Sequence, residues 1–173
     1  MKLTLNESQY LEALDIAKKR QAGALKKQRP SAHGYNENDP LKVHIQGTVA
    51  ELGISLITGQ QWHAYLEVLT GGTGKPPDVG EKLQVRSTEY STGHLIAHPS
   101  DSDEDIFVLV IVRGRDLIVK GWLPGHEAKQ QKYWGDKFKN GRPAYFVPQT
   151  DLRPCKALVE QFPGAPFVAI LSS

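Results

Sequence analysis

The spacing of apolar residues along the first third of the chain predicts two helices. We expect the first over residues 7–27, and Pro30 ends that segment. Its apolar stripe is predicted to consist of Leu11, Leu14, Ile16 and Ala17. Polar and turn-forming residues then predict a loop over 31–40. The apolar segment 45–57 is long enough for a helix of about three turns, and Gly59 suits its C-terminal stop.

β-branched and aromatic residues, interrupted by glycine and proline, predict a series of strands in the second half of the chain. These strands are LQVRS, HLIAH, IFVLVIV and DLIVKGW, which begin at residues 83, 94, 106 and 116. The run Phe107–Val112 shows no polar alternation and therefore predicts a central strand that is covered on both faces. A turn at Gly114 makes it a hairpin with the next strand. The segment 126–134 favours a short helix, and 144–148 favours a further short strand.

These elements predict one domain of the α/β class (α+β). A chain of 173 residues, 39% of them hydrophobic, can bury one core and is short for two. Within the single domain 1–173 we expect an N-terminal basic helix over 1–30, a core over 45–152 and a C-terminal extension over 153–173.

Hydropathy and cysteine usage predict an intracellular, cytoplasmic protein. No apolar run approaches the roughly 18 residues that span a bilayer, and the polar N-terminus is unlike a signal peptide. The single cysteine, Cys155, excludes an internal disulfide framework and a CxxC zinc pair, which fits a reducing compartment. We interpret this thiol as a packing residue.

Positive charge is concentrated in two segments, although the net charge is only +2. The first segment contains Lys18, Lys19, Arg20, Lys26, Lys27 and Arg29. The second contains Lys129, Lys132, Lys137, Lys139 and Arg142, interleaved with Tyr133, Trp134 and Phe138. Such segments either bind phosphates, with aromatic rings that stack on bases, or are solvated surfaces whose tryptophans anchor the core. The sequence leaves both interpretations open.

Glu51 is the one acidic residue in the apolar segment 45–57. Gly47 and Ser55 lie one turn away on the same helix face, which leaves room for a group to approach the carboxylate. A buried carboxylate is costly unless it has a partner, and a divalent cation would supply one. The alternative is a glutamate in the first helical turn or a glutamate that faces solvent.

Asp78 precedes a strand on which Gln84 and Arg86 share one face. An acid at the mouth of a strand, followed by a polar residue and then a cation two positions later, is what metal-dependent phosphodiester hydrolysis requires. The acids would hold the metal, the amide oxygen would complete its shell, and the cation would stabilise charge on the phosphate. The alternative is an ordinary Asp-Val-Gly turn before a surface strand.

The order of helix glutamate, aspartate and Q-x-R strand resembles the active-site region of the PD-(D/E)xK nuclease superfamily, in which the strand carries E-x-K. Residues 45–152, with GWLPGHEAK and GRPAYFVP, look like small phage-type members. The resemblance implies a restriction-endonuclease-like three-layer core, in which helices flank a central mixed sheet of four to five strands. It also implies a Mg²⁺ or Mn²⁺ site whose ligands are Glu51, Asp78 and Gln84. Arg86 stands in place of the motif lysine. Glutamine brings no charge, so the metal would bind more weakly, and arginine cannot serve as a base.

Two functions follow from this resemblance. The first is a metal-dependent nuclease that hydrolyses DNA. Its catalytic residues would be Glu51, Asp78, Gln84 and Arg86. Its DNA contacts would come from Lys82, Lys129, Lys132, Tyr133, Lys137, Lys139 and Arg142. The second is a catalytically inert nuclease-fold domain that binds nucleic acid or a host protein as an adaptor or inhibitor, and a homodimer is also open. A plain interaction protein, in which Glu51 and Asp78 never meet, is a third alternative.

Other motifs predict no further chemistry. The acidic hairpin tip 101–105 is interpreted as a solvated turn, because the rest of a calcium-binding loop is missing. His94 and His98 lie four residues apart on one predicted strand and show no zinc spacing. The string GGTGK at 71–75 is followed by Pro76 and lacks the full phosphate-loop pattern, which argues against a nucleotide site.

Overall fold

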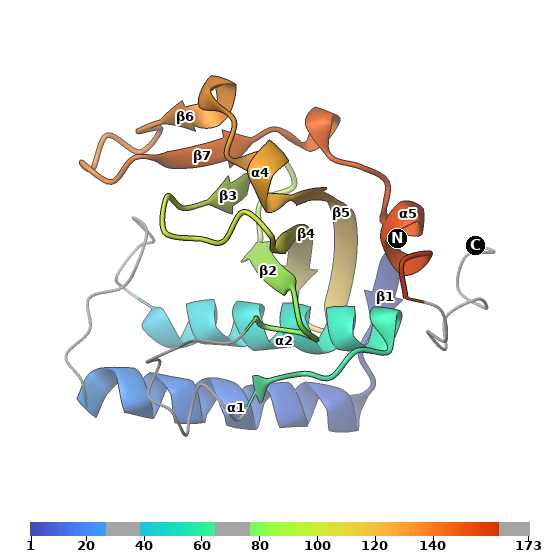
Figure 1. The fold of residues 1–173 in the computed structure, drawn as a ribbon. Coiled ribbons are helices and arrows are strands. Elements are labelled where there is room, and N and C mark those ends of the chain that lie inside the picture. The colour runs from blue at the N-terminus through green and yellow to red at the C-terminus, as the bar shows by residue number, and fades with distance from the viewer. Residues whose placement is uncertain (27–38, 65–76, 163–173) are drawn as a thin grey trace.

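The described elements of the domain stack in three layers (Figure 1). The computed structural model describes residues 1–26, 39–64 and 77–162. The first layer contains the helices α1 (Glu7–Lys26) and α2 (Pro40–Thr58). The middle layer is a sheet of β1 (Lys2–Thr4), β2 (Leu83–Thr88), β4 (Ile106–Arg113) and β5 (Asp116–Pro124). The third layer contains a smaller sheet of β3 (Leu95–Ala97), β6 (Trp134–Gly135) and β7 (Ala144–Val147). The short helices are α4 (Gly125–Ala128) and α5 (Cys155–Val159), with 3₁₀ turns at Gln131–Tyr133 and Gln149–Asp151.

The middle sheet is mixed and has the strand order β1-β5-β4-β2. β5 pairs antiparallel with both β1 and β4, whereas β2 pairs in parallel with β4, with Leu83 opposite Ile106. All residues of Phe107–Val112 are buried, as the unbroken apolar run predicts for a central strand. The four-stranded mixed sheet and its helices confirm the α+β class. The sequence did not predict β1, because three residues carry too little alternation to define a strand without its partner β5.

Alternation along β2 and β4 sends their side chains into two separate cores. Leu83, Val85 and Val108 face the helix layer and pack in one cluster with apolar residues of α2. Phe107 and Leu109 face the other way and pack with residues of β3 and β7. We predicted helices on both faces of the central sheet. In the described part of the chain, the second face is covered instead by the smaller sheet and the four-residue α4.

Three residues define the ends of α2. Asp39 accepts a hydrogen bond from the Lys42 backbone N–H at 3.1 Å, and Pro40 occupies the first turn, where the N–H that it lacks would have no helical partner. Gly59 ends the helix with a left-handed φ of 68°. The helix therefore begins at Pro40 and not at residue 45. Glu51 lies in its middle, so the first-turn alternative for this glutamate is wrong.

Some predictions for the remaining segments need correction or lie outside the described residues. Leu11 was predicted to face the core but is 56% exposed, and Ala13 packs in the core instead. The described residues include only Asp39 and Pro40 of the predicted loop 31–40, and none of the GGTGK string. No helix within 1–26, 39–64 or 77–162 is long and apolar enough to cross a membrane.

Candidate functional site

Glu51 lies against α1 with both of its carboxylate oxygens hydrogen-bonded. Arg20 Nη1 donates to Glu51 Oε1 at 2.8 Å, and Arg20 Nη2 donates to Oε2 at 2.7 Å, so the planar guanidinium binds both oxygens at once. Trp62 Nε1 also donates to Oε2, at 2.9 Å. The side chains of the ion pair are only 9% and 7% exposed. The partner that this buried carboxylate requires is therefore supplied by the chain itself.

Helix geometry directs Glu51 away from the middle sheet. Gly53 lies two residues further on, about 200° around the helix axis. It faces the sheet so closely that a Cβ at this position would meet Leu117 of β5 at 2.7 Å. Glu51 consequently points toward α1 and the indole of Trp62. Gly47 is not needed for this approach, since a Cβ there would lie an ordinary 3.8 Å from the carboxylate.

Asp78 caps the outer edge of β2, which has no further neighbour among the described strands. Its Oδ2 accepts the Val85 backbone N–H at 2.8 Å, and its side chain is buried. From this edge its charge acts on both sides of the sheet. Burial raises the pKa of Glu51, Asp78 raises that pKa further, and Arg20 opposes the rise. Burial also raises the pKa of Asp105, with Asp78 as a contributing cause. Asp78 and Glu51 therefore lie within electrostatic range of each other.

Gln84 and Arg86 lie on the opposite face of β2, toward the smaller sheet. Gln84 Nε2 donates to Asp105 Oδ2 at 3.0 Å. Arg86 donates from Nε to the Ile96 carbonyl of β3 at 3.0 Å and from Nη2 to Asp101 Oδ2 at 2.8 Å. Because α2 packs on the other face of β2 and β4, the middle sheet separates this pair from the glutamate of α2.

The acidic tip 101–105 contributes to this site and is not simply a solvated turn. Asp101 and Asp105 accept the hydrogen bonds of the Q-x-R strand. Parallel pairing sets Leu83 opposite Ile106 and so brings Asp105 beside the start of β2. The sequence held a signal for this position, because a parallel alignment of the two predicted strands brings their N-terminal ends together. The strand patterns do not predict that β2 pairs with β4, and for that reason they do not place these acids beside Gln84 and Arg86.

The four predicted catalytic residues do not fit a single Mg²⁺ or Mn²⁺ site. Both oxygens of Glu51 accept hydrogen bonds from a permanently charged guanidinium. Gln84 and Arg86 lie across the sheet from it. A cation with oxygen ligands near 2.1 Å requires its ligands to converge on one point. Within the described residues, no three His, Cys, Asp or Glu side chains converge in this way.

Two of the predicted DNA contacts, Lys129 and Tyr133, bind other parts of the fold. Lys129 donates to the Asp101 carbonyl at 2.7 Å and pairs with Asp103 at 2.6 Å, which ties the acidic tip to the end of α4. Tyr133 is only 9% exposed, and its hydroxyl donates to Asp151 at 2.8 Å. The buried ring of Tyr133 therefore has no face on which a base could stack.

The other basic residues differ in their exposure and in their partners. In α1, Lys19 pairs with Asp15 at 2.6 Å and Arg20 with Glu51, so part of the first basic segment is neutralised by acids. Lys82, just before β2, and Lys132 are exposed. Lys132 lies 3.8 Å from a carboxylate oxygen and 4.6 Å from the ring centroid of its neighbour Tyr133. These two lysines stay candidates for phosphate contacts.

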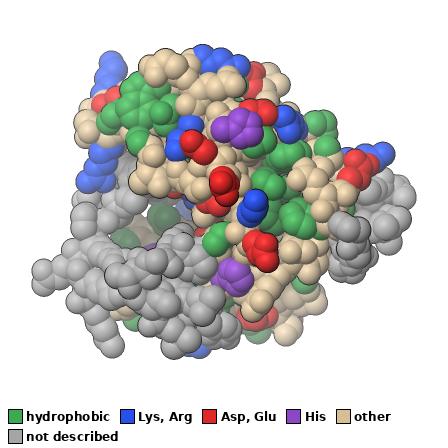
Figure 2. Space-filling view, viewed as in Figure 1, with side chains coloured by type: hydrophobic (Ala, Val, Ile, Leu, Met, Phe, Trp, Pro, Cys, Tyr) green, Lys and Arg blue, Asp and Glu red, His purple; other side chains and the backbone are tan. Residues whose placement is uncertain are grey.

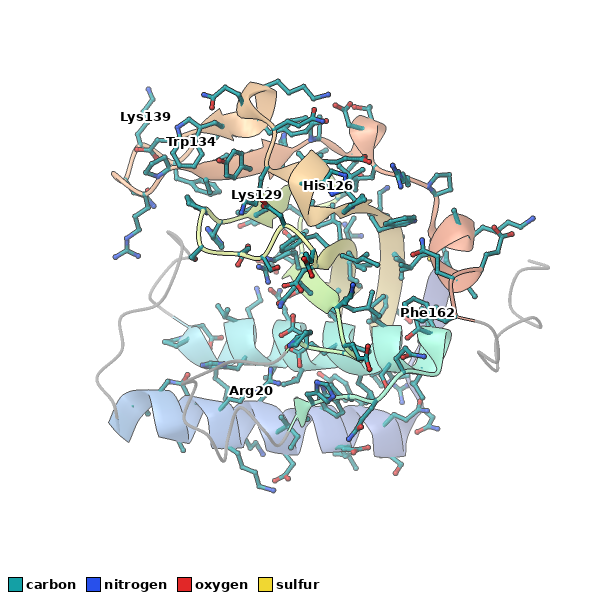
Figure 3. All side chains as sticks on the ribbon, viewed as in Figure 1. Arg20, His126, Lys129, Trp134, Lys139 and Phe162 are labelled. Carbon is teal, nitrogen blue, oxygen red and sulfur yellow. The ribbon has the colours of Figure 1, made fainter. Side chains whose placement is uncertain are left out.

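The hairpin that joins β6 to β7 presents cations beside exposed aromatic rings. We call this group of hairpin residues the hairpin face, and its members are Trp134, Lys137, Phe138, Lys139 and Arg142. Trp134 is 37% and Phe138 is 54% exposed. Each ring rests on a ring of β7, with centroids 4.8 Å apart for Trp134 on Tyr145 and 5.5 Å apart for Phe138 on Phe146. Tyr145 and Phe146 are successive residues of β7, so Trp134 and Phe138 pack on opposite sides of that strand. Trp134 and Lys139 lie far from Arg20 and the helix layer (Figure 3). Basic and hydrophobic side chains are adjacent at this end of the molecule (Figure 2).

Asp136 shapes the turn that carries this face. Its two carboxylate oxygens accept the Asn140 and Gly141 backbone N–H groups at 3.2 and 2.9 Å. Asp136 is the sole acid in the segment 136–141, and its negative charge is bound by these two backbone N–H groups. Lys139 has a φ of 51°, a left-handed conformation that is unfavourable for a lysine. Lys137 Nζ lies 2.8 Å from His94 Nε2, which fastens the turn to the start of β3.

Comparisons with protein-family models, with curated proteins and with solved structures find no match to this chain. Its function therefore has to be inferred from two features of the described residues. One is the edge of β2 around Asp78, and the other is the hairpin face.

Proposed function

We propose that this domain binds DNA through the hairpin face. The observation that carries the proposal is the presence, on one hairpin, of three cationic side chains and two exposed aromatic rings. Cations in such an arrangement bind phosphates, and aromatic faces stack on bases of any identity. The exposed rings favour a nucleic acid over a plain solvated surface, because exposed aromatic rings carry a hydration cost that stacking on a base removes.

This function is the second of the two that the resemblance to the PD-(D/E)xK superfamily implies. In that interpretation the chain has a restriction-endonuclease-like core and binds DNA without cutting at the helix glutamate. Two features support it. Glu51 is engaged by Arg20, and Gln84 with Arg86 face the other side of the sheet.

The turn offers phosphates a local excess of positive charge. Lys139 and Arg142 are exposed. Lys137 lies beside His94, whose pKa is lowered first by burial and then by the lysine charge, which disfavours a positive charge on the imidazole. The Asp136 carboxylate accepts hydrogen bonds from the backbone of the turn. Among the described residues, the turn therefore carries three cations and one acid, and the backbone binds the carboxylate of that acid.

The test is fluorescence anisotropy of a labelled oligonucleotide, titrated at several salt concentrations with the wild type and with a triple variant. The variant carries Lys137→Ala, Lys139→Ala and Arg142→Ala. Each phosphate contact that is lost should reduce the slope of log K against log salt by about 0.9 on duplex or 0.7 on single-stranded DNA. Binding by the triple variant should be weaker and less sensitive to salt than binding by the wild type.

Lys156→Ala is the matched control, since this lysine side chain is 70% exposed on α5, away from the hairpin (Figure 1). It should bind DNA as the wild type does. The proposal is rejected if the folded triple variant matches Lys156→Ala in both affinity and salt slope. Thermal melting of each variant verifies that it is folded.

A second candidate function, metal-dependent hydrolysis of DNA, is favoured by one observation at the edge of β2. Gln84 donates to Asp105 at 3.0 Å, and the pKa of Asp105, which is raised chiefly by burial, receives its smallest contribution from the charge of Asp78. The ligands of Mg²⁺ or Mn²⁺ would be these two carboxylates and the Gln84 amide oxygen. Arg86, on the same face as Gln84, would bind a phosphate. In this arrangement Asp105, and not Glu51, supplies the charge that Gln84 lacks.

This second function is tested with MnCl₂ alone, by calorimetry, and with linear, circular and branched DNA in Mg²⁺ or Mn²⁺. Asp78→Asn and Asp105→Asn should each lower metal affinity and abolish cutting, whereas Glu51→Gln should retain both. The reverse result, with loss in Glu51→Gln and activity in Asp105→Asn, would contradict the ligand set. No cutting by the wild type would leave DNA binding as the function.

A further inference from the structure

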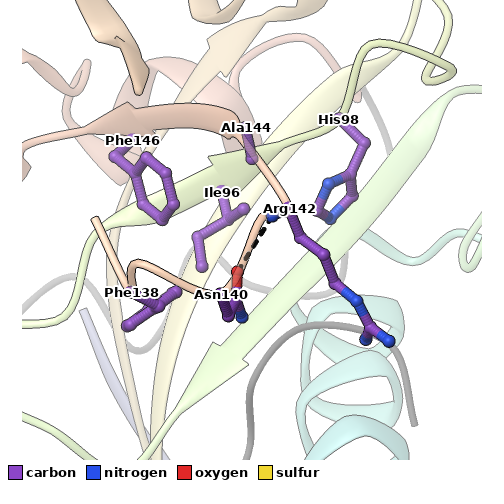
Figure 4. A pocket seen from close by; sticks show the side chains of 7 residues that line it. All are labelled: Ile96, His98, Phe138, Asn140, Arg142, Ala144 and Phe146. Atoms are coloured by element: carbon purple, nitrogen blue, oxygen red, sulfur yellow. Dashed lines mark hydrogen bonds between the residues drawn. The ribbon is translucent and has the colours of Figure 1, made fainter. Parts of the chain in front are cut away.

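We infer that the hairpin face selects single-stranded DNA and that one unpaired base stacks on Phe138, over a shallow pocket between the hairpin turn and β3. This inference rests on the proposed DNA binding, to which it adds the form of the substrate and a base-binding subsite. Three groups of side chains define the subsite: an apolar floor, an exposed ring and a polar rim (Figure 4).

The floor of the pocket is apolar, and Phe138 stands beside it. Ile96 of β3 with Ala144 and Phe146 of β7 forms the floor. The rings of Phe138 and Phe146 meet at 76°, an edge-to-face contact. Phe138 nevertheless stays 54% exposed. A flat aromatic ligand can therefore stack on Phe138 and cover part of the floor at the same time.

Polar groups line the rim of the same pocket. Asn140 Oδ1 accepts the Arg142 backbone N–H at 3.0 Å, the bond drawn in Figure 4, which leaves the Asn140 amide nitrogen as a donor at the rim. His98 stands on the opposite side. Base edges carry carbonyl and ring-nitrogen acceptors that an amide N–H donor recognises. The Arg142 side chain extends away from the floor, in a direction suited to the phosphate next to a stacked base.

A base within a duplex cannot use this subsite. Its two faces are covered by neighbouring bases and its pairing edge is engaged, so stacking on a protein ring requires an unpaired, unstacked base. The pocket has a volume of about 10 Å³, which is too small to enclose a whole nucleotide flipped out of a duplex. Single-stranded DNA supplies unstacked bases without the free-energy cost of opening pairs, and we therefore expect it to bind more tightly than duplex DNA.

Two substitutions of Phe138 test the subsite. Phe138→Leu keeps an apolar side chain over Phe146 but removes the aromatic face, whereas Phe138→Trp keeps an aromatic face. Each is titrated against a labelled single strand and a duplex of equal length. Relative to the wild type, Phe138→Leu should bind the single strand about tenfold more weakly and the duplex equally well. Phe138→Trp should retain single-strand binding, and photocrosslinks from an iododeoxyuridine oligonucleotide should map to Phe138 in the wild type.

Equal affinity of the wild type for both DNA forms, or unchanged single-strand binding by Phe138→Leu, overturns the subsite and leaves the proposed DNA binding intact. Failure of the proposed DNA binding gives a different result. In that case the triple variant of Lys137, Lys139 and Arg142 has the same affinity for DNA as the wild type. If Phe138→Leu weakens single-strand and duplex binding alike, the turn has been disturbed and the crosslink decides. A crosslink outside the pocket residues overturns the inference, and one at Phe138 supports it.

Discussion

Arg20 of α1 and Glu51 of α2 join the two helices through a pair of buried hydrogen bonds of 2.8 and 2.7 Å. Taking both charges out of water offsets much of their attraction, so the pair as a whole adds little net stability. Its effect is on specificity, because a guanidinium donates to both oxygens of a carboxylate in only one relative position of the two helices. In this pair Arg20 binds both oxygens of Glu51, the residue that the sequence predicts as a metal ligand.

Arg20→Met should lower the free energy of unfolding by about 3–5 kcal/mol, because it leaves Glu51 as an uncompensated buried charge. Urea denaturation measures this change. The double variant Arg20→Met, Glu51→Met removes both charges and should recover most of the loss. Lys19→Met is the control, since Lys19 and Asp15 form an exposed pair with side chains 47% and 56% exposed, and it should change stability by less than about 1 kcal/mol. Equal effects of Arg20→Met and Lys19→Met would show that the buried pair is not formed.

Two replacements of Asp78 should separate the contribution of its hydrogen bond to stability from the effect of its charge on Asp105. Asp78→Ala leaves the buried Val85 N–H without its acceptor and should cost about 1–3 kcal/mol of stability. Asp78→Asn keeps an oxygen acceptor but removes the charge, so it should be less destabilising and should lower the pKa of Asp105. Urea denaturation and an NMR titration of the carboxyl groups measure the two effects. An unchanged Asp105 pKa in Asp78→Asn would contradict the coupling across the edge of β2.

His94 should make the fold less stable in mildly acidic solution. Burial, and then the charge of Lys137, lower the pKa of His94 in the folded state, whereas an unfolded histidine titrates near about 6.5. Between these two pKa values the unfolded chain binds more protons, so the free energy of unfolding falls as the pH drops below about 6.5. Urea midpoints at a series of pH values measure this slope.

His94→Gln should flatten the pH dependence, because glutamine still offers an acceptor near Lys137 and does not titrate. His126→Gln is the matched control, since the His126 side chain is 66% exposed, and it should keep the wild-type slope. If the two variants have the same slope as the wild type, His94 does not link proton binding to folding.

Lys139 should lower the stability of the fold and strengthen binding to DNA. Its φ of 51° is readily adopted by glycine, so Lys139→Gly should raise the free energy of unfolding by about 1 kcal/mol while weakening binding to DNA. Lys139→Ala removes the same charge without relieving the backbone and should weaken binding with no gain in stability. Thermal melting and anisotropy titrations measure the two properties. A Lys139→Gly variant that is less stable than Lys139→Ala would contradict the strained turn.

Periodicity was sufficient for the local elements because it depends on each segment's own neighbours. The apolar run of β4, the polar alternation of β2 and the stop at Gly59 all appear in the structure as their patterns predict. The sequence by itself also determined that Gln84 and Arg86 share one face, and that basic and aromatic residues interleave between 129 and 142.

Tertiary structure alone decided which of these groups meet. The partner of Glu51 is Arg20, which lies 31 residues away in α1, and the spacing of residues within α2 does not predict this contact. Whether the polar face of β2 looks toward α2 or away from it depends on which face the helices cover, and they cover the face of Leu83 and Val85. Within the basic segment, Tyr133 is buried and Phe138 is exposed, although both are aromatic residues beside lysines. The physical reason is the same in each case: side-chain partners and solvent exposure are set by contacts between segments, and periodicity carries no information about those contacts.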